Sequence, residues 1–337
     1  MGPWIGDHMS PDPLDVHEQD NLAEWSQMVR VDVITSELMS RIGIGRADGQ
    51  TGPQVSVFHK HIEDAATAGD SVVDCKLYRM VGLRRPLPAD FSAQLEHLRS
   101  YADLRSDRAG EILTQAGGYL PYFSAVAAIS PSKKRYTHEL LAVAQAVASH
   151  VVLYVKHGLA CKRPDTYSAQ IQPIIPTPGH GALPSGHATE THLVATVLAK
   201  LLESRSKDQQ GNPTPHLTNM LLRVAGRISQ NRTVAGVHFP VDSIAGATLG
   251  VQLGKYLANR AMGNTQLEDI DFNGEGLGAE LFKPELLELA NGADPMAIDL
   301  TAMAGVTSNG PQNLPAVNSF KSDPLAWLWD QAAAEWN

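Results

Sequence analysis

The chain has 337 residues, of which 43% are hydrophobic and 19% charged, and its formal net charge is -9 at pH 7. This composition is typical of a globular protein with a sizeable core. The negative charge and the absence of a basic tract in the sequence exclude nucleic acid as an expected partner.

Helical patterns recur along most of the sequence. Apolar residues return at steps of three to five, and turn residues such as Gly117 and Gly118 separate the segments. Residues 55–83 are ambiguous, and neither a strand-rich alternation nor a long repeat stands out. The expected fold is therefore mainly α, a helical bundle. Helices are predicted over residues 21–42, 90–116, 137–160, 185–203, 217–231, 240–262 and 324–336.

The ambiguous segment contains His59 and His61 in the pattern His-x-His. Two such imidazoles can begin a metal site, but the sequence suggests no third ligand. We therefore expect a solvated pair of histidines on the surface.

The sequence predicts one main domain. Residues 1–19 are rich in Pro and Asp and are expected to be disordered. A single α-helical catalytic domain is expected over residues 20–262, with its motifs inside residues 135–262, and residues 263–337 are expected to form an extension that packs on this domain. The tail holds three tryptophans that, if exposed, would favour a homo-oligomer: Trp327, Trp329 and Trp336.

The N-terminus, the cysteines and the most apolar segment indicate the expected cellular location. The start, MGPWIGDHMS, lacks the basic residues and apolar run of a secretory leader. Cys75 and Cys161 are too few for a disulfide framework, so reduced thiols are expected. Residues 140–160 contain Lys156 and other polar residues, which indicates a core helix and no membrane span. We expect a soluble protein, cytoplasmic, or exported if a native leader is missing.

The tetrapeptide Pro184-Ser185-Gly186-His187 precedes a helical pattern. Free backbone N–H groups at a helix N-terminus favour an anion, and Gly186 lets the backbone approach it closely. The Ser185 hydroxyl adds a hydrogen bond, and His187 suits proton transfer near neutral pH. Alone, the tetrapeptide equally fits a helix N-cap followed by a surface histidine.

Two cations precede this tetrapeptide. Lys156 and Arg163 are seven residues apart, a helical spacing that would place both on one face near a helix end. The planar fork of Arg163 can bind two oxygens of an anion, and Lys156 supplies a point charge. Taken singly, the pair also fits an ordinary cationic helix C-terminus.

A third cation, a histidine and a carboxylate follow in the segment NRTVAGVHFPVD, as Arg232, His238 and Asp242. Asp242 comes four residues after His238. On a helix that begins near Phe239, its carboxylate could reach back and fix the tautomer of the imidazole. The alternative is a surface arginine, a buried histidine and a solvated aspartate.

In this order and spacing the motifs resemble the signature shared by type-2 phosphatidic acid phosphatases, bacterial non-specific acid phosphatases and vanadium-dependent haloperoxidases. That signature is K-x6-RP, then PSGH, then SR-x5-H-x3-D. One position departs from it, since Asn231 stands where Ser is usual. The resemblance covers about residues 135–262 and implies the helical bundle of that superfamily. The matching residues are Lys156, Arg163, Pro164, Pro184, Ser185, Gly186, His187, Arg232, His238 and Asp242.

The resemblance also implies roles. His238 would be the axial group, either the phosphate nucleophile of a phosphatase or the ligand to vanadium in a haloperoxidase. His187 would be the acid–base residue. One constellation can serve both reactions because vanadate stably adopts the trigonal bipyramidal arrangement of phosphoryl transfer. The residues implied to hold the equatorial oxygens are Lys156, Arg163, Ser185, the Gly186 N–H and Arg232.

His180, seven residues before His187, bears on the choice between the two reactions. Bromoperoxidases of this superfamily are similar in having a histidine at that offset. The first hypothesis is therefore a vanadate-dependent haloperoxidase that oxidises bromide or iodide with hydrogen peroxide. The alternative is a soluble, acid-phosphatase-like phosphomonoesterase for small phosphate esters, with His238 as nucleophile and His187 as general acid. A non-catalytic protein that binds phosphate or vanadate is a third hypothesis.

Overall fold

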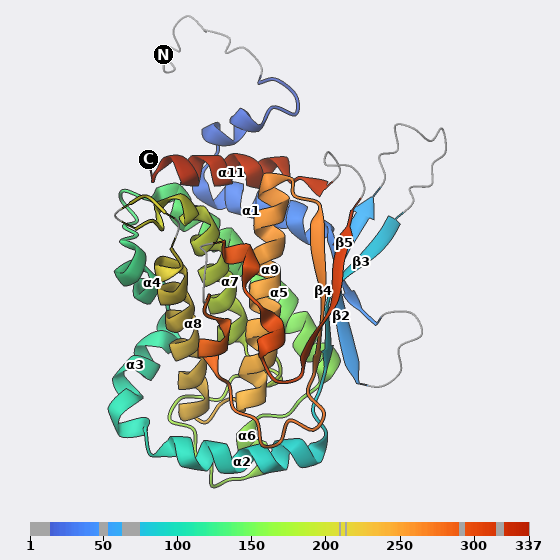
Figure 1. The fold of residues 1–337 in the computed structure, drawn as a ribbon, viewed down its shortest axis with the longest axis vertical. Coiled ribbons are helices and arrows are strands. Elements are labelled where there is room, and N and C mark those ends of the chain that lie inside the picture. The colour runs from blue at the N-terminus through green and yellow to red at the C-terminus, as the bar shows by residue number, and fades with distance from the viewer. Residues whose placement is uncertain are drawn as a thin grey trace, which may run out of the picture.

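The computed structural model describes residues 14–46, 53–62, 75–208, 210–212, 214–289, 294–314 and 320–336. The disorder expected for the N-terminal segment falls outside these residues up to residue 13. Helices dominate the described part, as predicted. Four of them, α5, α7, α8 and α9, run side by side as the centre of a bundle (Figure 1). They span Arg135–Leu159, Gly186–Leu201, His216–Val234 and Pro240–Met262.

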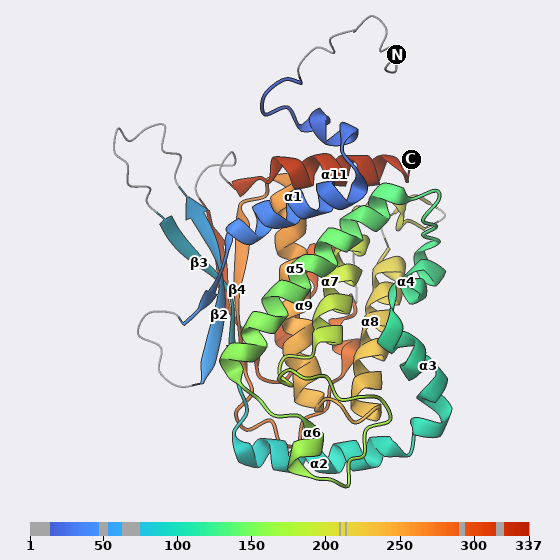
Figure 2. The same ribbon diagram turned by 180° about the vertical axis from the view of Figure 1, so that it is seen from behind.

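Shorter helices cover the ends and one side of this bundle. α1 and α11 cross one end, and α2 and α6 cross the other (Figures 1 and 2). α3 and α4 pack along α8. The helix predicted over residues 90–116 is in fact two, α2 and α3. The bounds are α1 Gln27–Ser40, α2 Pro88–Ala102, α3 Arg105–Gly117, α4 Leu120–Ala127, α6 Pro164–Tyr167 and α11 Asp323–Ala334, with 3-10 turns at Gln19–Glu24, Glu203–Arg205, Pro284–Leu287, Pro295–Ala297 and Leu300–Ala302.

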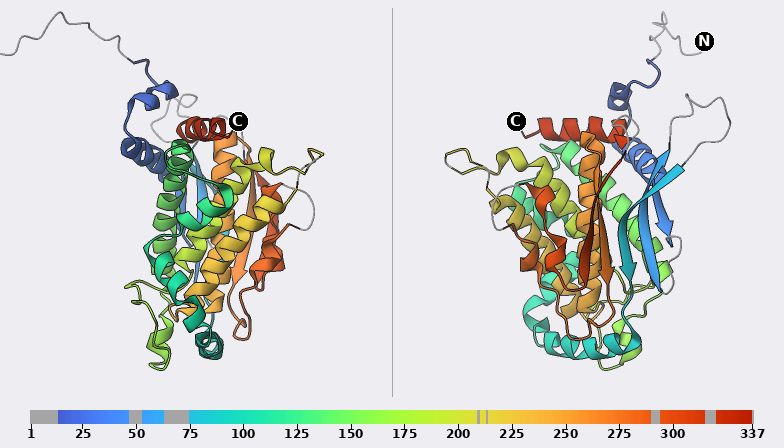
Figure 3. Two further views of the ribbon diagram at one scale, coloured as in Figure 1. Left: turned by 90° about the vertical axis from the view of Figure 1, so that its left-hand side faces the viewer. Right: turned by 45° about the vertical axis from the view of Figure 1, so that its right-hand side comes forward.

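A mixed five-stranded sheet lies beside the bundle, so the fold is mainly α as expected but is not a helical bundle alone. The strand order is β1-β2-β3-β4-β5; β3 and β4 are parallel, with Val81 opposite Ile270, and the other neighbours are antiparallel. The sheet packs on α5 and α9, and Figure 3 shows the helices on one of its faces. The strands are β1 Ile42–Gly45, β2 Gln54–Ile62, β3 Cys75–Arg84, β4 Gln266–Asn273 and β5 Val306–Asn313.

The sequence pattern did not predict these strands, and their burial and composition explain why. The middle of β2 is buried on both faces, which removes the alternation of apolar and polar residues that marks a half-buried strand. β5 has the sequence VTSNGPQN and is mostly exposed, so little in its composition favours a strand. The full sheet forms only because β3 and β4, which are far apart in the sequence, pair with each other in the folded chain.

His59 and His61 are buried, at 0% and 3% exposure, and are not the solvated surface pair that was expected. His59 Nδ1 lies 3.0 Å from the Tyr256 hydroxyl, and its ring packs edge-on against Phe320. Burial lowers the pKa of His59 to about 3, so its imidazole is neutral. Among the described residues, no group of three or more His, Cys, Asp or Glu side chains is placed to hold a metal ion.

The tail is part of the core. Trp327 and Trp329 are each only 8% exposed, so they are not the exposed anchors on which an oligomer was suggested. α11 packs across α5 and α9, and the indole N–H of Trp336 donates to the Thr137 hydroxyl at 2.9 Å. Both cysteines are free thiols, as expected.

The expectation that the chain has no membrane span is corrected. Among the described residues, the segment Arg135–Tyr167, which contains α5, is long and apolar enough to cross a membrane by length and composition. Its 18-residue apolar window has a mean hydropathy of 1.3, and 56% of that window is buried inside the protein. The core helix of a soluble protein meets the same two criteria.

Close packing of α7 on α9 sets the position of the motif residues. A Cβ atom on Gly250 would lie 2.3 Å from the Thr189 carbonyl oxygen, and one on Gly246 would lie 2.7 Å from the Ser185 carbonyl oxygen. Only glycine at these positions lets the two backbones touch. The first turns of α7 and α9 are therefore held side by side.

Candidate active site

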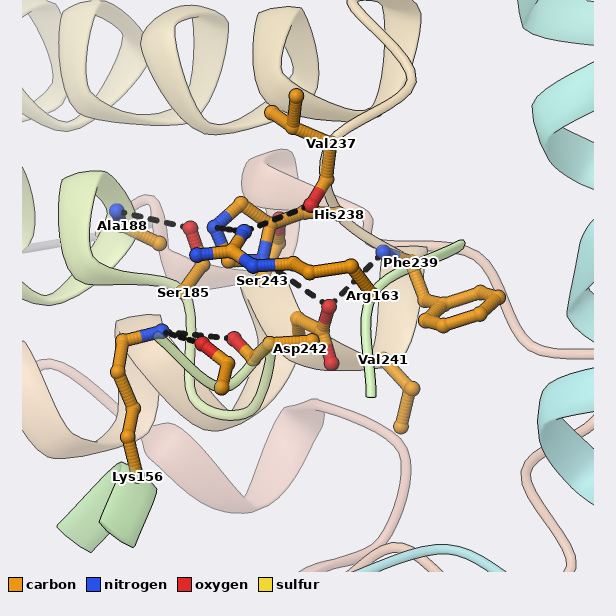
Figure 4. A network of polar contacts seen from close by, with 12 residues as sticks. Lys156, Arg163, Ser185, Ala188, Val237, His238, Phe239, Val241, Asp242 and Ser243 are labelled. Atoms are coloured by element: carbon orange, nitrogen blue, oxygen red, sulfur yellow. Dashed lines mark hydrogen bonds and ion pairs between the residues drawn. The ribbon is translucent and has the colours of Figure 1, made fainter. Parts of the chain in front are cut away.

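The motif residues meet at the end of the bundle that α2 and α6 cover. Lys156 lies in the last turn of α5, Arg163 precedes α6, and Ser185 caps α7. Arg232 lies in the last turn of α8, and His238 stands just before α9. Because these helix ends lie together, residues spread over a long stretch of sequence gather around one point (Figure 4).

Lys156 is buried, at 2% exposure. Its Nζ donates to the carbonyl oxygens of Gly181 and Ala182, both at 2.8 Å. An ammonium group has three donors, so one remains for a ligand. Burial, reinforced by the charge of Arg163, lowers its pKa.

The expectation that Lys156 and Arg163 share a helical face is wrong. α5 ends at Leu159, and Ala160 is left-handed with φ 51°. The chain then turns back and places Arg163 over the start of α9. The Nη1 atom of Arg163 donates to the Val237 carbonyl at 2.7 Å and lies 2.9 Å from His238 Nε2.

The tautomer of His238 follows from its two partners. A guanidinium group can only donate, so Nε2 must carry a lone pair facing Arg163. Nδ1 therefore carries the proton and donates to Asp242 Oδ2 at 3.0 Å, the contact expected from the spacing of these two residues. Burial and the charges of Arg163 and Lys156 hold the pKa of His238 well below its usual value. The imidazole is neutral, and its Nε2 carries the lone pair that a nucleophile needs.

Asp242 holds this histidine and the start of α9 together. It is the third residue of the helix, and its Oδ2 also accepts the Phe239 N–H at 2.9 Å, which satisfies a free main-chain donor at the helix N-terminus. Burial raises the pKa of Asp242, while the Phe239 N–H and the nearby cations oppose that shift. Two donors on one oxygen are consistent with an ionised carboxylate.

Ser185 and Gly186 form the N-terminus of α7. Ser185 is fully buried, and its Oγ accepts the Ala188 N–H at 3.4 Å, so its hydroxyl proton remains available. The Ser185 N–H donates to the Asp242 carbonyl at 2.8 Å, which links α7 to α9. A Cβ on Gly186 would lie 3.9 Å from Lys156 Cε, so this N-terminus and the ammonium group adjoin. Such a terminus favours an anion.

Arg232 gives the best test of whether an oxyanion fits. It is 1% exposed, and its Nη2 donates to the Ile112 carbonyl at 3.3 Å and to Gln115 Oε1 at 3.1 Å. Its Nε and Nη1 atoms are buried and have no hydrogen-bond partner within the described structure. Its pKa is lowered by burial to about 10, so it is still a cation at neutral pH. Unpaired buried donors are costly, and a tetrahedral oxyanion would satisfy both.

His187 lies in the first turn of α7, as predicted. Its Nε2 is 3.2 Å from the Gln115 carbonyl oxygen, and its ring packs edge-on against Tyr119. Since a carbonyl only accepts, Nε2 carries the proton and Nδ1 the lone pair. Burial, reinforced by the charge of Arg232, lowers the pKa of His187 to about 4.

His180 lies at the rim, on an exposed turn of the loop between α6 and α7. Its main-chain carbonyl accepts from Arg163 Nε at 3.0 Å, and its Nδ1 lies 3.1 Å from Arg163 Nη2, a donor, and 3.2 Å from the Gly181 carbonyl oxygen, an acceptor. His180 thus supports Arg163 from outside. Burial of the ring lowers its pKa.

Two residues of the site lie outside the predicted set. Asn231, at the position where the signature has Ser, donates through Nδ2 to Gln115 Oε1 at 3.0 Å. Gln115 therefore contacts Asn231, Arg232 and His187. No motif marks it, because α3 reaches the site only through its packing on α8.

Comparisons with known proteins agree with the motif content. The PAP2 superfamily model matches residues 136–264. No curated protein matches. The chain is similar to a solved structure described as the first transmembrane PAP2 type phosphatidylglycerolphosphate phosphatase from Bacillus subtilis. The two share 19% sequence identity with a TM-score of 0.40, and the match covers 50% of this chain and 84% of that one. The segment that matches this family model contains all three motifs, from Lys156 to Asp242.

Proposed function

We propose that this protein is a phosphatase that hydrolyses small phosphate esters through a phosphohistidine at His238. The observation that carries the proposal is the tautomer of His238, with Nδ1–H bound to Asp242 and the Nε2 lone pair turned toward Arg163. A neutral imidazole held in this way is a nucleophile prepared for attack on phosphorus. The match of residues 136–264 to the PAP2 superfamily model supports the same reaction.

The surrounding donors suit the transferred phosphoryl group. Its charge develops on three oxygens, and catalysis of such transfers rests on positioning and electrostatic stabilisation. The two unpaired nitrogens of Arg232 and the third donor of Lys156 are buried groups that can face these oxygens. The residues proposed to hold them are Lys156, Arg163, Ser185, the Gly186 N–H and Arg232.

The reaction proceeds in two balanced steps. His238 Nε2 attacks phosphorus, the ester P–O bond breaks, and the leaving oxygen takes a proton from His187. A water molecule then attacks the phosphohistidine, its proton passes to His187, and the N–P bond breaks. Inorganic phosphate leaves, and both histidines return to their starting states.

Substrate binding is expected to prepare His187 as the acid. Without a ligand, burial and the charge of Arg232 hold its pKa at about 4. A phosphate dianion beside the ring adds the opposite charge, which favours the imidazolium form. The proton needed by the leaving group therefore becomes available when the anion binds.

Vanadate is a second ligand proposed for the same residues, which would hold it together with His238. Bound vanadate would supply the activation of peroxide on which halide oxidation depends. The residue that favoured this reading, His180, is exposed and is hydrogen-bonded to Arg163 through Nδ1. The match to the PAP2 superfamily model and the nucleophilic tautomer of His238 together favour the phosphatase.

Two assays on the purified protein test the proposal. One measures phosphate release from an aryl phosphate, with vanadate added as an inhibitor. The other measures bromination of an organic acceptor with vanadate, bromide and hydrogen peroxide. We expect phosphate release that vanadate inhibits and that His238→Ala abolishes. Vanadate-dependent bromination without phosphate release would overturn the proposal.

A further inference from the structure

A polar layer joins α3 to α8 beside the site. On α3 it contains Arg108, Glu111 and Gln115, which are three and four residues apart and so share one helical face. Glu111 forms an ion pair with Arg227 of α8 at 2.9 Å, and Arg108 Nη1 donates to Asn231 Oδ1 at 3.2 Å. α3 precedes the segment that matches the PAP2 superfamily model, so the layer joins that segment to a part of the chain outside it.

Gln115 is the innermost residue of the layer and is fully buried. Its Nε2 donates to Glu111 Oε1 at 3.0 Å, and because a carboxylate only accepts, this contact fixes which way the amide points. Its Oε1 therefore faces the site, where it accepts from Arg232 Nη2 at 3.1 Å and from Asn231 Nδ2 at 3.0 Å.

The main chain of Gln115 acts on a second site residue. Gln115 lies in the last turn of α3, where carbonyl groups lack partners within the helix. Its carbonyl oxygen accepts the Nε2 proton of His187 at 3.2 Å. This bond leaves Nδ1 as the nitrogen that can exchange a proton with a substrate.

We propose that Gln115 is a positioning residue for the phosphoryl transfer proposed above. Its side chain holds one end of the Arg232 guanidinium, so that Nε and Nη1 turn toward the phosphoryl oxygens. Its carbonyl holds the tautomer of His187. Asn231 belongs to the same clamp, since its amide binds Gln115 and is itself held by Arg108. Gln115 acts through its neighbours and does not touch the substrate.

The two contacts of Gln115 can be separated by mutation. Gln115→Met keeps the length of the side chain and the main-chain carbonyl but loses the acceptor for Arg232. We expect inorganic phosphate, measured by calorimetry, to bind about tenfold or more weakly, because a hydrogen bond to a charged group is lost. The control is Gln252→Met, since Gln252 is also buried but donates to the main chain of the sheet at Met80 and is remote from the motifs.

Gln115→Glu tests for a pH dependence of phosphate binding that would not arise if Gln115 only stabilised the fold. A carboxylate at this position still accepts from Arg232, but its charge competes with the phosphate for that guanidinium and repels Glu111. Phosphate binding should therefore weaken further as pH rises and the carboxylate ionises. The native glutamine does not titrate and should show no such additional loss.

A double-mutant cycle decides whether Gln115 works through Arg232. If it does, Gln115→Met should weaken phosphate binding in the native background and have little further effect in Arg232→Ala. Equal effects in both backgrounds, or native phosphate affinity in folded Gln115→Met and Gln115→Glu, would overturn the inference. Phosphate binding needs no turnover, so a protein that binds phosphate with these dependences but hydrolyses no ester would refute the proposed function and leave the role of Gln115 in holding Arg232 standing.

Discussion

The Nη1 atom of Arg163 lies 2.9 Å from Nε2 of His238. The guanidinium donor therefore points at the lone pair that attacks phosphorus in the proposed reaction. In that reaction, a phosphoryl group that approaches Nε2 has to replace this contact, and its oxygens are the natural new partners of the guanidinium. Arg163 would thus exchange a bond to the nucleophile for bonds to the substrate, while its bond to the Val237 carbonyl keeps it in place.

Arg163→Lys tests this exchange. Lysine keeps the charge but cannot hold the Val237 carbonyl, His238 and the substrate with one planar fork. We expect KM for an aryl phosphate to rise about 10- to 100-fold, as for the loss of one hydrogen bond to a charged group. Steady-state kinetics checks the change. His180→Ala is the comparison, since it removes only the outer support of Arg163 and should have a smaller effect; an unchanged KM in Arg163→Lys would contradict the assignment.

Asp242→Asn tests the tautomer of His238. The amide removes the negative charge that stabilises a histidine carrying a phosphoryl group, and its NH₂ can turn toward Nδ1 and favour the wrong tautomer. We expect kcat to fall about 100-fold or more. The fall should appear in kcat more than in phosphate affinity, because Asp242 does not face the anion. Loss of phosphate affinity with kcat unchanged would assign Asp242 to binding instead.

The pH dependence of phosphate binding tests Lys156. Burial and the charge of Arg163 lower the pKa of Lys156, so its ammonium loses a proton at a lower pH than an exposed lysine does. The charged form attracts phosphate, and affinity should therefore decline as pH rises through this lowered value. The test is to measure the inhibition constant of inorganic phosphate at a series of pH values between about pH 5 and about pH 9.

Lys156→Met is the matched control for that measurement. It should bind phosphate weakly at every pH and lack the decline caused by Lys156. The ionisation of phosphate itself is common to both proteins and cancels in the comparison. If the two proteins show the same relative decline, Lys156 is not the titrating group.

Gly250→Ala tests the contact between α7 and α9. The added methyl group would lie 2.3 Å from the Thr189 carbonyl oxygen, a main-chain atom that cannot move alone. We expect the free energy of unfolding to fall by about 1–3 kcal/mol or more, with loss of activity as Ser185 shifts against His238. Gly110→Ala in α3 is the control: nothing lies within 4 Å of its added Cβ, so it should stabilise the protein by up to about 1 kcal/mol. Thermal denaturation of both variants provides the test.

The sequence by itself determined the central helices and the composition of the site. Helix periodicity and capping are local, so α5, α7, α8 and α9 were predicted close to their observed bounds. The contact between His238 and Asp242 follows from a four-residue spacing at a helix start, which is also local.

Only the tertiary structure decided what depends on distant parts of the chain. The sheet forms because β3 meets β4 across a large separation in sequence, and neither strand shows this partner in its own composition. His59 is buried because α9 and Phe320 cover it, and Gln115 joins the site because α3 packs on α8. A residue's spacing along one helix can be worked out from the sequence, whereas the neighbour that a folded chain places opposite it depends on the packing of the whole molecule.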